Sequence, residues 1–324
     1  MPEAQRRDRS MEKPDLRNSI PWWLRISAKI VLARLPVPYS VWKRIGIFEH
    51  GFMDEPERAL RVFLAFAEAT GLLPDRNPST LLRYPRLLAG KSVLEIGPGD
   101  SLFTALVASS VGSARTWLVD SGDYASRAIQ PYAAMTAMLK ASGFATPWQS
   151  DLTTIEAMTK ACACTYLTDG LNSLKRIPAG SIDFCFSNAV LEHIPCGQFG
   201  EFINDLYRVM SPNGVAVHRV DLTDHLGGGL NNLRFSDKIW ESSLFSRSGF
   251  YTNRLRFSEI AGTFRHAGFD VTLPRIIKWD ALPLPKSRLN ERFRSFDDDD
   301  LRVLGFDVLA SKSRLGEARE RVRS

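Results

Sequence analysis

The stretch Val93-Leu94-Glu95-Ile96-Gly97-Pro98-Gly99-Asp100-Ser101 decides the fold. Its apolar residues predict a buried strand, and the Gly-x-Gly turn after it lets backbone N–H groups and a helix start approach a bound ligand. The dinucleotide pattern G-x-G-x-x-G would place a third glycine at position 102, where this chain has Leu102. Glu95 is an acid inside the strand, and a buried carboxylate needs a partner such as the cationic amino group of a ligand. The stretch therefore predicts a ligand site at the end of a buried strand.

Charge is distributed unevenly along the 324 residues. The net charge is +6, of which residues 1–20 carry +1, residues 21–48 carry +5 with no acid, and residues 312–324 carry +3. Residues 49–311 are therefore mildly acidic, with a net charge of −3. Binding to nucleic acid requires Lys and Arg clustered on the binding body. We therefore expect no nucleic-acid partner.

The sequence shows no secretory signal and no membrane-spanning run. The first ten residues are polar and charged, and no apolar run approaches the roughly 20 residues that cross a bilayer. The four cysteines, at positions 162, 164, 185 and 196, lack the paired C-x-x-C spacing of zinc sites, so we expect reduced thiols and no metal. These features predict a cytoplasmic protein.

From residue 91 onward, apolar runs of strand length alternate with helical segments. This alternation predicts an α/β fold with a Rossmann-like, seven-stranded, mostly parallel sheet and a terminal antiparallel hairpin. The expected strands are 91–96, 116–119, 165–167, 182–187, 215–220, 269–277 and 301–310. We divide the chain into a disordered N-terminus (1–19), a helical extension (20–90), the main domain (91–311) and a basic tail (312–324).

Two interpretations of residues 20–48 remain open. Trp22 and Trp23 followed by basic residues such as Arg25 are typical of a helix that lies in a membrane interface. Arg34 falls on the opposite side of that helix, which favours a helix packed on the main domain with its cations reaching the solvent. The first interpretation predicts peripheral contact with the inner face of the membrane.

A polar group follows each of the first five expected strands. The carboxyl ends of parallel strands meet at one edge of a sheet, and ligands bind there in open α/β folds. The groups are Glu95 to Ser101, Asp120, Asp169, Asn188 with Glu192 and His193, and Asp221 with His225. We expect them to contribute to one site.

This order of motifs resembles the class I S-adenosylmethionine-dependent methyltransferases over roughly residues 91–311. The resemblance is carried by V-L-E-I-G-P-G at 93–99, by the acid after the second strand, by I-D-F-C-F-S-N-A-V-L-E-H-I at 182–194 and by L-Y-R-V-M-S-P-N-G at 206–214. It implies an enzyme whose cofactor is S-adenosyl-L-methionine and assigns residues 91–311 to the methyltransferase domain.

The resemblance also implies a role for each strand end. It places the methionine portion of the cofactor at the Gly97 to Gly99 turn, with Glu95 near the amino group, and the ribose hydroxyls on the two carboxylate oxygens of Asp120. It places the adenine amino group near Asp169 and the methyl-bearing sulfur near Asn188. The expected cofactor-binding set is Glu95, Gly97, Gly99, Asp100, Ser101, Asp120, Asp169 and Asn188. A helix cap at Asp120, turn chemistry at Asp169 and a structural histidine at His193 are the plain structural alternatives.

The chemistry implied by the resemblance is an in-line displacement, in which positioning supplies most of the acceleration. A hydroxyl acceptor is helped by a general base, for which the candidates are His225, His193 and Asp221. The superfamily marks amino methylation of bases and glutamine with an Asp-Pro-Pro-Tyr-like sequence, whereas residues 187–190 read Ser-Asn-Ala-Val. The sequence therefore favours oxygen or carbon as the acceptor atom.

A looser resemblance concerns the acceptor. Residues 218–225, 232–237 and 253–256 are similar to bacterial methyltransferases met beside surface-glycan genes, which implies a sugar or lipid-linked glycan acceptor. Arg254 and Arg256 would then bind a phosphate or carboxylate, although paired arginines are also commonly solvated. Two alternatives remain open: a small-molecule methyltransferase of secondary or quinone metabolism, and a non-catalytic cofactor-binding scaffold.

Overall fold

The computed structural model describes residues 23, 24, 26, 55–146 and 153–312. The predictions for residues 1–19, for most of 20–48 and for 313–324 lie outside the described residues. The chain divides into two compact units, each made of separate stretches. The larger unit takes Pro38–Leu222, Asn253–Leu282 and Phe296–Ser324, and the smaller unit takes Met1–Val37, Thr223–Thr252 and Pro283–Ser295. The four-part division expected from the sequence stays a prediction.

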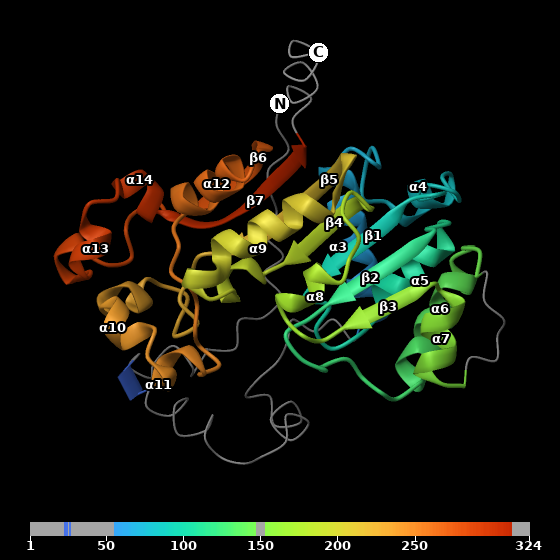
Figure 1. Cartoon of the computed structure of the whole chain (residues 1–324), viewed down its shortest axis with the longest axis horizontal. Coiled ribbons are helices and arrows are strands. Elements are labelled where there is room, and N and C mark those ends of the chain that lie inside the picture. Colours follow the sequence, from blue (N-terminus) through green and yellow to red (C-terminus); the bar gives the residue numbers. More distant parts are fainter. Residues whose placement is uncertain (1–22, 25, 27–54, 147–152, 313–324) are drawn as a thin grey trace, which may run out of the picture. The chain divides into compact units, whose positions relative to one another are not determined.

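The larger unit is built on a seven-stranded sheet with the order β3-β2-β1-β4-β5-β7-β6 (Figure 1). Strands β1 to β5 are parallel to one another, and β7 is antiparallel to both of its neighbours. The strands are β1 (Ser92–Ile96), β2 (Arg115–Val119), β3 (Cys164–Leu167), β4 (Ile182–Asn188), β5 (Met210–Asp221), β6 (Phe269–Lys278) and β7 (Val303–Lys312). The predicted α/β, Rossmann-like and mostly parallel sheet is confirmed. A topological switch point lies between β1 and β4, where such folds bind their ligands.

Helices cover both faces of this sheet. Along β1, Val93 packs into one core, whereas Leu94 and Ile96 pack into the other, because successive side chains of a strand point to opposite faces. The first core is shared with α3 (Pro56–Ala69), α4 (Pro78–Leu82), α5 (Phe103–Ser110), α6 (Gln130–Ala141) and α7 (Ile155–Ala161). The second is shared with α8 (Asn172–Lys175), α9 (Cys196–Val209) and α12 (Phe257–His266). The result is a three-layer α/β/α arrangement.

Helix α3 is an integral part of the first core. The ring of Phe63 meets the ring of Phe184 edge to face with centroids 6.0 Å apart, and Phe66 stacks on Phe186 at 5.2 Å. The guanidinium of Arg219 lies 5.2 Å from the centroid of Phe66. Residues 56–69, which fall within the helical extension expected from the sequence, therefore pack directly on the seven-stranded sheet.

Strands β6 and β7 form the antiparallel edge of the sheet. They pair as the sequence predicts, but residues 279–302 join them in place of a tight turn, and this connection includes α14 (Asp298–Leu301). The pairing shifts register between Thr272 and Arg275, on either side of Pro274. Proline has no N–H to donate to a ladder, so it is suited to this outermost strand.

The smaller unit has a core of its own made mainly of aromatic residues. Its described elements are η3 (Asn231–Arg234), α10 (Asp237–Trp240), α11 (Ser243–Ser246), η4 (Lys286–Arg288) and α13 (Glu291–Arg294). The core is formed by Ile26, Leu226, Trp240, Phe245, Phe250 and Tyr251, with Phe235 packed against them. The indole N–H of Trp240 donates to the Thr252 carbonyl at 2.7 Å, so the largest side chain of this core is also hydrogen-bonded. Across the described residues, no helix has the length and apolarity needed to cross a bilayer.

Candidate active site

The turn after β1 requires glycine for two reasons. Gly97 and Gly99 have φ angles of +73° and +66°, in the left-handed region that side chains disfavour. A Cβ atom on Gly97 would lie only 2.4 Å from Cγ2 of Val190, in the loop after β4. The Gly97 N–H donates to the Val119 carbonyl at 2.8 Å, which fixes the start of the turn against the end of β2. The backbone of the turn therefore lies directly against the Val190 side chain at the switch point.

The far side of this turn is braced by a buried tyrosine of α6. The Tyr132 hydroxyl accepts from the Leu102 N–H at 3.3 Å and donates to the Ser126 carbonyl at 2.9 Å. The Ser126 N–H in turn donates to the Asp100 carbonyl at 2.9 Å. Asp100 and Ser101 are both buried, at 2% and 3% exposure. The expected cofactor-binding residues Asp100 and Ser101 thus belong to the same braced turn as the two glycines.

Asp120 lies directly after β2 and is joined to the glycine turn. One carboxylate oxygen, Oδ2, accepts from the Gly99 N–H at 3.0 Å, and Oδ1 accepts from the Ser121 N–H at 2.7 Å. The residue is only half-buried, and each carboxylate oxygen can accept further hydrogen bonds. The structure therefore brings the Asp120 carboxylate and the glycine turn together.

Glu95 is a buried acid beneath the same turn. Its side chain is 3% exposed. Burial raises the pKa of Glu95 to about 8, the charge of Asp120 adds to the rise, and a hydrogen bond from Thr104 of α5 opposes it. The carboxyl is therefore held mostly as the neutral acid near pH 7, and a cation placed beside it would favour ionisation.

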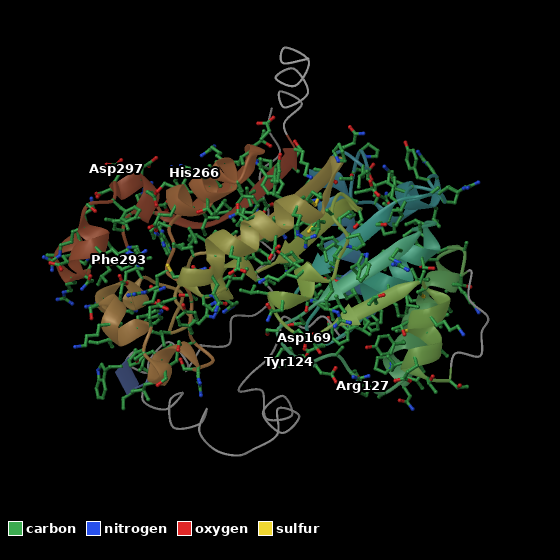
Figure 2. All side chains as sticks on the ribbon, in the orientation of Figure 1. Tyr124, Arg127, Asp169, His266, Phe293 and Asp297 are labelled. Atoms are coloured by element: carbon green, nitrogen blue, oxygen red, sulfur yellow. The ribbon has the colours of Figure 1, made fainter. Side chains whose placement is uncertain are left out.

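The ends of β3 and β4 carry Asp169 and Asn188. Asp169 is exposed and ion-pairs with Arg176 at 3.2 Å, and the neighbouring Gly170 N–H donates to the Asp120 carbonyl at 3.0 Å. Figure 2 labels Asp169 after β3 and Tyr124 in the segment that follows Asp120. Asn188 is half-buried at the last position of β4, where it pairs with Arg219 of β5. Both residues lie at the carboxyl edge of the sheet, as the sequence predicts from the strand order.

The short helix η2 (Leu191–His193) follows β4 and holds a second buried acid. Glu192 is 1% exposed, and neither of its carboxyl oxygens has a hydrogen-bond partner among the described residues. Burial raises the pKa of Glu192 well above its usual range, and the charge of Asp221 adds to the rise. His193 is exposed and Asp221 is half-buried at the end of β5. This part of the edge therefore brings the buried carboxyl of Glu192 near the carboxylate of Asp221, with His193 exposed next to it in the sequence.

Asn253 fixes the position of this loop. Its side-chain amide donates to the carbonyls of Leu191 at 2.8 Å and Ile194 at 2.9 Å, and its backbone N–H donates to the Glu192 carbonyl at 2.7 Å. The residue is 1% exposed. A single amide therefore ties the loop after β4 to the segment that leads into α12.

The third expected base, His225, belongs to the smaller unit, whereas His193 and Asp221 belong to the larger one. His225 is half-buried in a stretch where the Asp224 carboxylate accepts from the Leu226 N–H at 3.1 Å and the Asn231 N–H at 2.6 Å. The local fold of His225 is thus defined within its own unit.

Arg256 has a structural role, which corrects the interpretation of this residue as an anion-binding or solvated group. It is 1% exposed, and its guanidinium donates to the backbone carbonyls of Leu222, Asp300, Leu301 and Val303. Burial lowers its pKa to about 10, while the charge of Asp300 opposes the change. Arg254, which is also buried at 3% exposure, adopts a φ of +61°. Sequence alone did not show that these arginines are interior.

Several residues that shape the site carry no distinctive sequence signal. Thr104 and Tyr132 sit in ordinary apolar helices, and Asn253 lies in a loop far along the chain from the carbonyls it binds. Glu192 is visible in the sequence beside His193, but its burial depends on the packing of η2. Such partners become evident only once the elements are assembled.

Comparison with known protein families identifies the family of this chain. A family described as "Methyltransferase domain" matches residues 69–273, which is more than half of the chain. The chain therefore belongs to this methyltransferase family. The methyltransferase family predicted from the sequence is confirmed. A comparison with curated proteins gives no match.

Among solved structures, similar chains include three methyltransferases at low identity. Phosphoethanolamine N-methyltransferase 2 of Haemonchus contortus is 16% identical with a TM-score of 0.39, over 73% of this chain and 52% of that chain. An arsenic(III) methyltransferase of Chlamydomonas reinhardtii is 13% identical with a TM-score of 0.39, over 69% and 63%. An S-adenosylmethionine-dependent methyltransferase of Mesorhizobium loti is 15% identical with a TM-score of 0.36, over 71% and 95%. This chain thus spans about half the length of the nematode enzyme.

Proposed function

We propose that this protein transfers a methyl group from S-adenosylmethionine to a hydroxyl of a sugar or lipid-linked glycan. The single observation that supports binding of the cofactor is the hydrogen bond from the Gly99 N–H to the Asp120 carboxylate, near the switch point of the sheet. The acceptor half rests on sequence, namely the Ser-Asn-Ala-Val run at 187–190 and the looser resemblance to glycan-associated methyltransferases. The proposed partners are the cofactor and a small-molecule or glycan acceptor, without nucleic acid.

The residues present suit a ligand with a cationic amino group at one end and a ribose in the middle. Burial raises the pKa of Glu95, and an ammonium group placed beside it would favour its ionised form. The half-buried Asp120 carboxylate provides two oxygens for two hydroxyls. When bound, S-adenosylmethionine supplies an electrophilic methyl group on a sulfonium.

Each predicted cofactor-binding residue can be assigned to one part of the cofactor or of the turn that holds it. We assign Glu95 to the ammonium group, the Gly97 to Gly99 backbone to the methionine portion and Asp120 to the ribose. We assign Asp169 to the adenine amino group and Asn188 to the region of the sulfur. Asp100 and Ser101 shape the turn from within, since both are buried. These assignments follow the order of the strands in the sheet, and all of the assigned residues lie at its carboxyl edge.

Three groups remain assigned to proton acceptance from the hydroxyl: His193, Asp221 and His225. As the acceptor oxygen forms its bond to the methyl carbon, the base takes the hydroxyl proton and the carbon–sulfur bond breaks. His193 is exposed at the end of η2, where an imidazole can reach a bound acceptor. The buried neutral acid Glu192 beside it is held in place by the loop that Asn253 fixes.

The cofactor half is tested by calorimetric titration of S-adenosylmethionine into wild type and Asp120→Ala. We expect the variant to bind about 10- to 150-fold more weakly, which corresponds to the roughly 1.5–3 kcal/mol of hydrogen bonds to a charged group. The matched control is Asp123→Ala, which removes an acid three residues away that pairs with Arg127 on the surface. Unchanged affinity in Asp120→Ala would contradict the assignment of Asp120 to the ribose.

The acceptor half is tested by incubating the protein with cofactor labelled in the methyl group and with separated cell envelope and cytosol. We expect the label in glycan or glycolipid of the envelope. Label in small cytosolic molecules would instead indicate a small-molecule methyltransferase. Cofactor binding without transfer to either fraction would indicate a scaffold.

A further inference from the structure

An ion pair of the larger unit lies near the carboxyl end of β5. Arg219 and Asp307 face each other across the antiparallel ladder of β5 and β7. The Nε and Nη2 nitrogens of Arg219 donate to the two carboxylate oxygens of Asp307 at 2.9 and 3.1 Å. Asp307 is buried, so water competes little for these oxygens. Such a bidentate pair fixes the orientation of the planar guanidinium as well as its position.

An aromatic ring supports the same guanidinium. Its central carbon lies 5.2 Å from the centroid of Phe66, a buried residue of α3. Phe66 in turn stacks on Phe186 of β4, with the ring centroids 5.2 Å apart. A ring at this distance attracts a cation through its negative face. The guanidinium of Arg219 is therefore held along one edge by Asp307 and also by the ring of Phe66.

The tip of this guanidinium is left for another partner. Arg219 carries N–H groups on Nε, Nη1 and Nη2, and Asp307 takes only the side formed by Nε and Nη2. Among the described residues, Nη1 makes no hydrogen bond or ion pair. The Arg219 side chain is 27% exposed, whereas that of Asp307 is 5% exposed. A fixed pair of N–H donors, one on each Nη nitrogen, is therefore available to a ligand.

Arg219 is also the neighbour of Asn188 in the sheet. The two residues are partners in the parallel pairing of β4 with β5, so their side chains leave the same face of the sheet. The Ala189 N–H donates to the Arg219 carbonyl at 2.9 Å, which holds the end of β4 against β5. Arg219 therefore lies one strand away from the residue assigned to the region of the sulfur, beside which the methyl acceptor must bind.

We propose that Arg219 holds the methyl acceptor by donating from the tip of its guanidinium to two adjacent hydroxyl oxygens, as a sugar presents them. This role rests on the proposed function, in which the acceptor is a sugar hydroxyl. The planar fork of N–H groups fits two neighbouring oxygen atoms. Because the carboxylate of Asp307 already neutralises the guanidinium charge, the pair favours uncharged hydroxyls over a phosphate or carboxylate. Asp307 is a positioning residue, since it acts through Arg219.

The test measures transfer of a labelled methyl group to glycan purified from the cell envelope, over a range of glycan concentrations. We expect Arg219→Lys to raise the apparent KM for glycan about tenfold, because an ammonium group cannot form the planar fork. Arg219→Met/Asp307→Leu leaves no buried charge unpaired, so it should fold and show at least the same rise in KM. We expect kcat and the affinity for S-adenosylmethionine to be unchanged in both, since neither residue takes the hydroxyl proton or holds the cofactor.

The matched control is Lys175→Ala/Glu201→Ala, which removes an exposed ion pair between α8 and α9 of the same unit and should keep the KM of wild type. The proposal is overturned if both Arg219 variants keep the wild-type KM, or if inorganic phosphate competes with glycan in wild type but not in Arg219→Lys, which would indicate an anion site. Label only in small cytosolic molecules would contradict the glycan acceptor, and the KM for that fraction then decides on Arg219 by the same criterion. Absence of transfer by wild type would contradict both.

Discussion

The two halves of the sheet's carboxyl edge differ in how their acids are satisfied. At the end of β2, each oxygen of the Asp120 carboxylate accepts a backbone N–H, from Gly99 and from Ser121. After β4, the buried carboxyl of Glu192 has no hydrogen-bond partner among the described residues. The first half is shaped by backbone, which sequence motifs encode directly. The second half depends on side chains brought together by packing, and its chemistry is accordingly harder to read from a motif.

The largest change in stability is expected from Gly97→Ala, which alters the half of the edge that is shaped by backbone. A left-handed alanine costs about 1–2 kcal/mol, and the clash of its Cβ with Val190 adds about 1–3 kcal/mol. We expect a loss of roughly 2–5 kcal/mol in the free energy of unfolding by urea titration, together with much weaker cofactor binding.

Gly180→Ala is the matched control for Gly97→Ala. Gly180 has a φ of +64°, and a Cβ there meets nothing within 4 Å. It should show only the backbone cost of about 1–2 kcal/mol. Equal losses in the two variants would mean that the close approach to Val190 has no energetic weight.

The next-largest effect is the contribution of Glu192 to the pH dependence of the free energy of unfolding. Its pKa is raised in the folded protein, so the fold binds this proton more tightly than the unfolded chain does. Stability from this residue is therefore complete below the unfolded pKa, and it falls as the pH rises above that value, by up to about 1.4 kcal/mol per pH unit. Glu192→Gln should flatten this fall, as measured by urea unfolding from pH 5 to pH 9. An unchanged slope would show that the acid is solvated in solution.

A smaller and more specific effect is expected at Glu95. With a pKa of about 8, the carboxyl is about nine-tenths protonated at pH 7 and must ionise to face an ammonium group. We expect S-adenosylmethionine to displace close to one proton on binding, measured by calorimetry in buffers of different ionisation enthalpy. Glu95→Gln should abolish this release while Glu192→Gln retains it. Retained proton release in Glu95→Gln would place the proton on another group.

The smallest effect is expected at Asp169. Its carboxylate is 61% exposed and already paired with Arg176, so solvent screens any further contact. Asp169→Ala should weaken cofactor binding only a few-fold in the same titration. A loss as large as that of Asp120→Ala would show that the adenine contact is buried when the ligand is present.

Sequence patterns predict the sheet well because strand length and alternation are local properties. The expected strand at 91–96 is observed at Ser92–Ile96, and the expected order of acids after the strands reproduces the carboxyl edge. The helix that begins at Gln130 shows a local signal, since Pro131 stands in its first turn, where its missing N–H costs nothing. Arg256 and Asn253 could not be predicted in this way. Their partners are backbone carbonyls distant in sequence, and either side chain would be equally ordinary on a surface.

The central claim is that Glu95, the Gly97 to Gly99 turn and Asp120 together hold S-adenosylmethionine at the switch point between β1 and β4. A crystal structure with S-adenosylhomocysteine tests it most directly. We expect both ribose hydroxyls to lie within hydrogen-bond distance of the Asp120 carboxylate and the amino group to lie beside Glu95. A ribose held by any other acid, or a ligand bound away from the glycine turn, would contradict it.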